Sequence, residues 1–216
     1  DKDYAEQRIQ LEKIKNDQLQ TELKFLKSQY HPHFLFNALN TVYFQIDESN
    51  KAPRRTLEMI SELLRYQLYG GNQKVSILQE IDYLKTYIAL RKLRMSERLR
   101  LRVEFPPELN ELNIYPLLFL PLVENAFKYV GGDYQLDIIM KWENNRISLF
   151  IRNSIPELSA EDEALRKSVD ERQRKGIGLV NLRRRLSLLY PNKHRLETRK
   201  EETEFVAELM IEIEDI

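Results

Sequence analysis

Cysteine is absent from the 216 residues of the chain. Its absence excludes disulfides, a thiolate nucleophile and zinc sites built on thiolates, and it suits a reducing compartment. A net charge is also lacking, because 34 basic residues balance 34 acidic ones. No overall field therefore attracts a polyanion or an anionic membrane surface, and we predict that nucleic acid is not a partner.

Long apolar runs are equally scarce. The longest nearly uninterrupted one, residues 114–123, contains two prolines and falls well short of the roughly 20 residues that a membrane-spanning helix needs. No signal peptide is visible. The chain starts inside a charged helical pattern and without methionine, so we expect it to be part of a longer protein. Its 42% hydrophobic and 31% charged residues suffice for one or two cores.

Glycine and proline are missing from residues 1–30, which are rich in good helix formers. We predict one long helix there, whose sparse leucines suit a two-stranded coiled coil, although a solvated helix explains them as well. Two amphipathic helices follow, one from Leu35 to Ile46 and one over 54–69, joined by the polar stretch 47–51. They predict an antiparallel hairpin, and two copies of it would close a four-helix bundle.

The pattern changes near Arg98, where we place a domain boundary. Before it, Ser76 and Gln79 predict a capping box that starts a helix over 78–98. After it, period-two alternation predicts strands over 99–105, 134–142, 147–152 and 204–213, with a turn at 143–145 and helices over 117–129 and 180–190. Mixed strands with helices that cover one side predict an α/β sandwich, so that the chain as a whole is α+β.

Two of the three histidines, His31 and His33, stand at the start of the first amphipathic helix. That helix carries the apolar stripe Leu35, Ala38, Leu39, Val42 and Ile46, and the stripe of the second helix is Leu57, Ile60, Leu64 and Leu68. On a regular helix His33 lies nearly opposite the first stripe, so its imidazole stays accessible while the stripe packs. A metal site formed by His31 and His33 is a weaker alternative, because residues two apart do not share a helix face. We interpret His194 as an exposed loop residue.

Three polar side chains lie within about 100° of one another on the helix over 117–129. They are Glu124, Asn125 and Lys128. An amide oxygen can hold a hard cation, an ammonium group neutralises phosphate, and a carboxylate orders water or takes a proton, so the group suits a magnesium-phosphate ligand. An ordinary polar helix face explains this triplet, taken alone, at least as well.

Gly176 and Gly178 precede the helix over 180–190. Glycine lets a backbone approach a ligand closely and the free amides of a helix start attract phosphate, although many helices that begin in this way bind nothing. The densely charged segment before them, 157–175, contains no glycine. It predicts either a segment that closes over a ligand or a solvated loop.

Taken in this order, the motifs resemble those of the LytS-type sensor histidine kinases, whose cytoplasmic part joins a histidine-bearing dimerisation region to a GHKL-type ATPase domain. Residues 32–40, Pro-His-Phe-Leu-Phe-Asn-Ala-Leu-Asn, are similar to the phosphoacceptor box of that family, with His33 at the acceptor position. Residues 121–128 resemble its N box, and residues 176–186 resemble its G box. The likeness spans nearly the whole chain.

The resemblance implies three regions: a signalling helix or coiled coil over 1–30, dimerisation and phosphotransfer helices over 31–98, and a GHKL-type ATP-binding domain over 99–216 with helices on one face of a mixed sheet. It implies ATP and Mg²⁺ as cofactors. His33 would accept the phosphoryl group, and Glu124 would order water or help to take the imidazole proton. Asn125 would be the metal ligand, and the remaining nucleotide contacts would come from Lys128, Asn153, Gly176, Gly178 and Asn181, with the Asn153 amide oxygen accepting from the adenine amino group.

The resemblance also implies a bacterial homodimer that passes phosphate from His33 to an aspartate of a response regulator, expected to be of the LytTR type. A sensor segment would precede Asp1, so that this chain would be the cytoplasmic portion of a plasma-membrane (inner-membrane) phosphoprotein. The alternative is a catalytically weak or inactive signalling module whose ATPase-like domain relays conformation to a partner. It rests on Asn153 and Tyr129, which stand where relatives often have aspartate and histidine.

Overall fold

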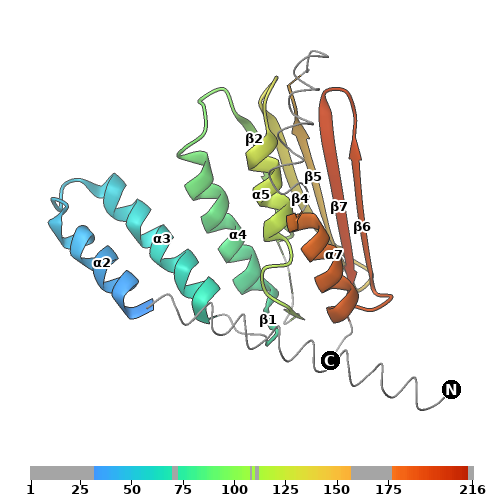
Figure 1. Ribbon diagram of the computed structural model, residues 1–216, viewed down its shortest axis with the longest axis horizontal. Coiled ribbons are helices and arrows are strands. Elements are labelled where there is room, and N and C mark those ends of the chain that lie inside the picture. The colour runs from blue at the N-terminus through green and yellow to red at the C-terminus, as the bar shows by residue number, and fades with distance from the viewer. Residues whose placement is uncertain (1–31, 70–72, 108, 110–111, 157–176, 214–216) are drawn as a thin grey trace. The chain divides into compact units, whose positions relative to one another are not determined.

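The computed structural model describes residues 32–69, 73–107, 109, 112–156 and 177–213 (Figure 1). These residues form two compact units, and the chain divides between Tyr69 and Gly70. The helix expected over 1–30, His31, Gly176 and the charged segment 157–175 lie outside the described residues. None of the described helices is both long enough and apolar enough to cross a membrane.

The first unit is a helical hairpin, as the sequence predicts. Helix α2 spans Pro32–Gln45 and helix α3 spans Lys51–Tyr69. In the connection, the Asp47 carboxylate accepts hydrogen bonds from the backbone N–H and the hydroxyl of Ser49, at 2.8 and 2.5 Å. Arg54 of α3 donates to the carbonyl of Ile46 at 2.8 Å. Local polar groups thus satisfy the backbone where α2 ends and the chain reverses.

The face that α2 turns toward α3 keeps part of the predicted stripe, because Leu35, Leu39 and Ile46 are partly buried, and it also includes aromatic residues. Phe36 stacks on Tyr69 with ring centroids 6.3 Å apart, and the Tyr43 hydroxyl donates to Glu58 at 3.0 Å. Val42, which belongs to the predicted stripe, remains 46% exposed. Aromatic rings bury more area than valine or alanine, so they set the contact face. In α3 the buried residue among those described is Leu63, which adjoins the predicted stripe.

The second unit is a mixed sheet with helices on one face (Figure 1). Its five strands have the order β2-β4-β5-β7-β6. They are β2 Arg100–Glu104, β4 Gln135–Glu143, β5 Arg146–Ser154, β6 His194–Lys200 and β7 Glu204–Glu212. Strand β2 pairs with β4 in parallel, and the other pairs are antiparallel. The covering helices are α4 Ile77–Lys92, α5 Leu120–Tyr129 and α7 Ile177–Leu189. A separate small sheet pairs β1, Val75–Ser76, with β3, Asn113–Ile114.

Period-two alternation decides which strand residues face the helices. Ile138 of β4 is in register with Ile151 of β5, and both are buried in the core under the helices. Two residues further along β5, Asn153 therefore points to the same face at the end of the strand. At the other end, Asn144 and Asn145 have φ of 50° and 58°, as a tight hairpin turn requires. This alternation brings a polar side chain to the covered end of the sheet.

Helix α4 belongs to the core of the second unit. The predicted capping box is present, with Ser76 as N-cap and Gln79 accepting from its backbone N–H at 3.2 Å. Its residues Ile77, Ile81 and Leu84 are buried in the hydrophobic core between the helices and the sheet. The compact units accordingly divide before α4, and not near Arg98. The sequence did not reveal this division, because an amphipathic pattern does not say which core a helix joins. The functional ranges 1–30, 31–98 and 99–216 stay a prediction.

The interpretation of His194 as an exposed loop residue is wrong. His194 begins β6, is only partly exposed, and its Nδ1 lies 2.7 Å from the carbonyl oxygen of Tyr190. Strand β6 is an edge strand whose buried side chain is Leu196, while most of the others are charged. Because Leu196 is the one buried apolar residue of β6, the sequence lacks the alternation of apolar and polar residues that predicts a strand.

Candidate functional site

His33 lies in the first turn of α2 with its side chain exposed. One turn later on the same face, Asn37 places its Nδ2 atom 3.2 Å from His33 Nδ1. The imidazole is therefore held on one side and open to a reagent on the other. This exposure agrees with the prediction that His33 faces away from the packing side of the helix.

Helix α5 presents the predicted polar triplet on the side away from its core face. Pro121 stands in its first turn, where the missing amide proton has no cost. The buried residues of α5 are Leu120, Leu122, Val123, Ala126 and Phe127. Glu124 and Lys128 are exposed and Asn125 is partly exposed. The Lys128 ammonium lies 5.0 Å from the centre of the Tyr129 ring.

The surroundings of Glu124 come from α4. Although Glu124 is an exposed residue, surrounding protein atoms partly desolvate its carboxyl and raise the pKa of that group, and the positive charge of Arg91 opposes this shift. Burial also raises the pKa of the Tyr87 hydroxyl, and the negative charge of Glu124 adds to that effect. The Arg91 guanidinium lies 5.7 Å from the centre of the Phe127 ring. Such partly apolar surroundings strengthen a carboxylate as a proton acceptor.

Asn153 supplies an unpaired acceptor beneath the helices. Its side chain is 0% exposed, and its Nδ2 donates to the Ser154 carbonyl at 3.3 Å. Its Oδ1 is buried and has no hydrogen-bond partner among the described residues. Buried acceptors nearly always have a donor, because leaving one unpaired costs free energy. The chemistry fits a ligand that brings an N–H donor, such as the amino group of adenine.

Ser154 ties the end of the Asn153 strand to the end of α5. The Ser154 hydroxyl donates to the Gly131 carbonyl at 2.6 Å, and the Gly131 N–H donates to the Ser154 carbonyl at 3.0 Å. A Cβ on Gly131 would lie 2.9 Å from Cδ of Pro156, and Gly132 has φ of +59°. These contacts were not predicted from the sequence. The signal that could have revealed them is the Gly-Gly pair that follows Val130, the C-cap of α5.

Helix α7 brings Gly178 and Asn181 one turn apart, both exposed. A Cβ at Gly178 would meet nothing within 4 Å. The fold therefore does not require glycine here, and the small residue leaves open space beside backbone amides that attract phosphate. Helix α5 contacts both β5 and α7. The predicted residues Asn125, Lys128, Asn153, Gly178 and Asn181 thus come from three elements that pack together.

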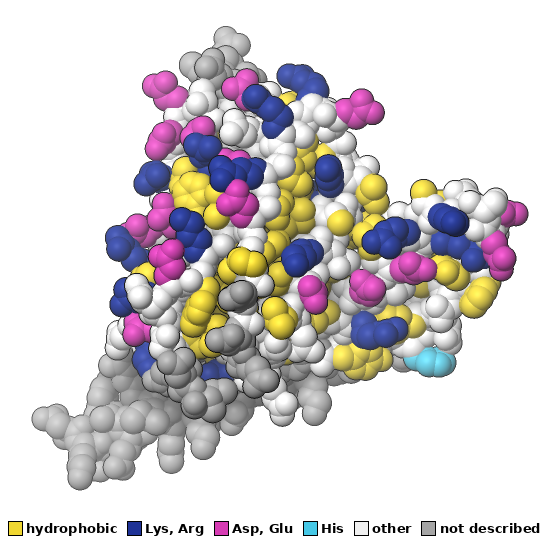
Figure 2. Space-filling view, turned by 180° about the vertical axis from the view of Figure 1, so that it is seen from behind, with side chains coloured by type: hydrophobic (Ala, Val, Ile, Leu, Met, Phe, Trp, Pro, Cys, Tyr) yellow, Lys and Arg dark blue, Asp and Glu magenta, His cyan; other side chains and the backbone are white. Residues whose placement is uncertain are grey.

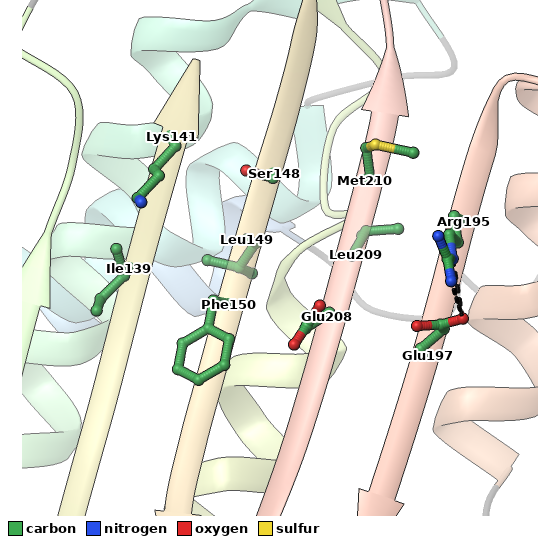
Figure 3. A pocket seen from close by; sticks show the side chains of 10 residues that line it. All are labelled: Ile139, Lys141, Ser148, Leu149, Phe150, Arg195, Glu197, Glu208, Leu209 and Met210. Carbon is green, nitrogen blue, oxygen red and sulfur yellow. Dashed lines mark hydrogen bonds and ion pairs between the residues drawn. The ribbon is translucent and has the colours of Figure 1, made fainter. Parts of the chain in front are cut away.

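A hollow of about 460 Å³ lies on the opposite face of the sheet (Figure 3). Its apolar lining includes Ile139, Phe150 and Met210, and the pair Arg195–Glu197, 2.7 Å apart, borders it. Figure 2 shows apolar side chains gathered over this uncovered face, with charged side chains around them. None of the predicted site residues lines the hollow. It is therefore separate from the residues that the motifs single out.

Comparison with known proteins gives two kinds of sequence match. Residues 21–99 match the model of the histidine kinase family. The sensor protein kinase HptS of Staphylococcus aureus is 29% identical over 180 residues, which cover 81% of this chain and 35% of HptS. This chain thus spans about a third of the length of the curated relatives it matches. The matches support a sensor histidine kinase, whereas the finer LytS-type assignment stays a prediction.

Solved structures of histidine kinases are also similar. The histidine kinase AdeS of Acinetobacter baumannii is 14% identical, with a TM-score of 0.43, over 87% of this chain and 98% of that one. The catalytic domain of the histidine kinase ThkA is 17% identical, with a TM-score of 0.41, over 64% of this chain and 94% of that one.

Proposed function

We propose that the chain is the cytoplasmic catalytic part of an ATP-dependent sensor histidine kinase that phosphorylates itself on His33. The observation that carries the proposal is the buried, unpaired Oδ1 of Asn153 on the helix-covered face of the sheet. It calls for a donor that the described part of the chain does not supply and that adenine has. The exposed imidazole of His33 supplies the nucleophile.

The residues divide the work of holding the nucleotide. Asn153 accepts from the adenine amino group, and Lys128 neutralises phosphate charge. Asn125 is the side chain for Mg²⁺, which when bound neutralises the charge of the triphosphate. Gly178 and Asn181 at the start of α7, together with Gly176, take the phosphates. All these groups position the substrate, which is most of what a protein contributes to phosphoryl transfer.

The transfer forms one bond and breaks one. A ring nitrogen of neutral His33 attacks the γ-phosphorus, and ADP leaves with the bridging oxygen. Glu124 takes the ring proton, a role that suits a carboxylate whose pKa is raised by burial. A response-regulator aspartate, which we expect to be of the LytTR type, then receives the phosphoryl group from His33.

The hairpin suits a homodimer. Phe34, Val42 and Phe44 are exposed on α2. Two hairpins that cover these side chains would form a four-helix bundle. Because HptS is by name a sensor protein kinase and is longer than this chain, we infer that a sensor segment outside this sequence anchors the protein in the bacterial plasma membrane. The motifs at residues 32–40, 121–128 and 176–186 are the basis for proposing the LytS type.

Labelled ATP tests the acceptor. Incubated with labelled ATP and Mg²⁺, the chain should become an acid-labile phosphoprotein. The label should be lost in His33→Gln and retained in the matched control His31→Gln, which changes a neighbouring histidine in the same way. Label that survives in His33→Gln would reject His33 as the acceptor.

One contact favours the alternative of a catalytically weak signalling module. The Lys128 ammonium already interacts with the Tyr129 ring, and the ring therefore competes with phosphate for this ammonium group. Asn153 also offers adenine no full charge. Calorimetry with ATP and Mg²⁺ distinguishes the two functions, because the signalling module should bind no nucleotide up to millimolar concentration.

A further inference from the structure

The turn that leads into α5 has an unusual backbone. Leu117 has φ of 59°, in the left-handed region that favours glycine. Helix α5 begins three residues later, at Leu120. A leucine keeps this conformation only where surrounding contacts hold it. The position of α5, and of Asn125 on it, therefore depends on what holds this turn.

Two other helices supply those contacts. Glu80 of α4 accepts a hydrogen bond from the Leu117 N–H at 3.0 Å. Arg185 of α7 donates from Nη2 to the Pro116 carbonyl at 2.8 Å and from Nη1 to the Leu117 carbonyl at 3.5 Å. The planar fork of an arginine holds two carbonyls in a fixed geometry, which the single nitrogen of a lysine does not impose. We call Glu80, Arg185 and residues 116–117 the turn clamp.

The two charged groups of the turn clamp support each other. Glu80 is 0% exposed and Arg185 is partly buried. Burial lowers the pKa of the Arg185 guanidinium, and the negative charge of Glu80 opposes that shift. Opposite charges that share a buried turn offset part of each other's desolvation cost. Both residues bind the same turn, Glu80 through the Leu117 N–H and Arg185 through the Pro116 and Leu117 carbonyls.

We propose that Glu80 and Arg185 are positioning residues that hold α5 in a set place relative to α7, so that Asn125 and Gly178 meet the same nucleotide. Arg185 lies seven residues after Gly178, about two helical turns along α7. Helix α7 therefore reaches the triphosphate at its start and the beginning of α5 further along. This inference rests on the proposed function, because the geometry that it sets is that of the Mg²⁺-triphosphate site.

Calorimetry on Arg185→Gln tests the clamp. We expect affinity for ATP with Mg²⁺ to fall about tenfold, because small displacements of positioning groups carry large costs. Affinity for ATP in EDTA should change less than about threefold, because Asn153 lies on β5, which is not part of the clamp. Arg184→Gln is the matched control, because Arg184 is the neighbouring arginine and its side chain is exposed. A merely structural role would lower the melting temperature and affect both affinities alike.

Further variants keep the test decisive. Arg185→Lys retains the charge and N–H donors but loses the planar fork, so it should fold and show an intermediate loss with Mg²⁺, even if Arg185→Gln does not fold. Glu80→Gln retains an acceptor for Leu117 and should show a similar Mg²⁺-specific loss. If the wild type binds ATP and the folded variants bind Mg-ATP equally well, the clamp is overturned while the proposed function stands. If the wild type binds no nucleotide, both are overturned.

Discussion

The side-chain amide of Asn37 lies 3.2 Å from Nδ1 of His33, four residues earlier on α2. An amide can donate to this nitrogen or, when turned over, accept from its proton. The same amide nitrogen lies 3.5 Å from Nε2, so it lies close to both ring nitrogens. Asn37 is thus placed to orient the ring.

Asn37→Leu should slow autophosphorylation about tenfold, because the ring loses its orienting partner. ATP affinity should not change, since the nucleotide residues lie in the other unit. Phosphoprotein formation in single-turnover reactions measures the effect. The control is Thr41→Val, which removes a hydroxyl that donates to the Asn37 carbonyl at 2.8 Å. Equal rates in Asn37→Leu and wild type would exclude an orienting role.

Asn153→Ala should weaken ATP binding about tenfold to a hundredfold, the usual range for a buried hydrogen bond to a ligand. Stability should fall much less, because the substitution also removes an acceptor that is unpaired in the free protein. Calorimetry with ATP and with GTP provides an internal control, since guanine has no amino group at the corresponding position. We expect preference for ATP in the wild type and its loss in the variant; an unchanged preference would show that another residue recognises adenine.

Gly178→Ala should separate folding from binding. Alanine stabilises a helix interior by about 0.5–1 kcal/mol relative to glycine, so the gain should be smaller at Gly178, the second residue of α7, where a Cβ meets no neighbour. The variant should therefore melt at a higher temperature. Its methyl group occupies the space left for the phosphates, so affinity for ATP with Mg²⁺ should decrease. A variant that is more stable and binds ATP as tightly as before would remove Gly178 from the site.

Glu124→Gln should show a pH-dependent gain in stability. Burial raises the pKa of the Glu124 carboxyl, so the folded chain keeps this proton to higher pH than the unfolded chain does. As pH rises through the two pKa values, ionisation favours the unfolded chain and stability falls. The glutamine variant avoids that loss and should melt at a higher temperature near pH 7, with the difference shrinking near pH 4, where the wild-type carboxyl is protonated.

The same substitution should slow autophosphorylation about a hundredfold, the usual scale for the loss of a general base. Melting curves at the two pH values and single-turnover phosphorylation measure the two effects. A stabilisation of equal size at both pH values would show that the charge of Glu124 is not its cause.

Local patterns predicted much of the fold. The hairpin, the Ser76–Gln79 capping box, the turn at 143–145 and most strands follow from periodicity and short-range hydrogen bonds, which depend on neighbours in the sequence. Strand β6 escaped prediction because it offers one buried residue at a sheet edge. The core that α4 joins was also not predictable, since its apolar face would suit either unit.

For the candidate site, the sequence by itself determined the chemical groups and their helix faces: an imidazole opposite an apolar stripe, and a carboxylate, an amide and an ammonium on one side of α5. The tertiary structure alone decided that Asn153 has an acceptor without a partner among the described residues. It also decided that Ser154 forms a hydrogen bond with Gly131, and that Glu80 and Arg185 form hydrogen bonds with the turn at Leu117. These contacts join segments that are far apart in the chain. Periodicity describes one element at a time, and only the packing of several elements shows which polar atoms meet and which are left without a partner.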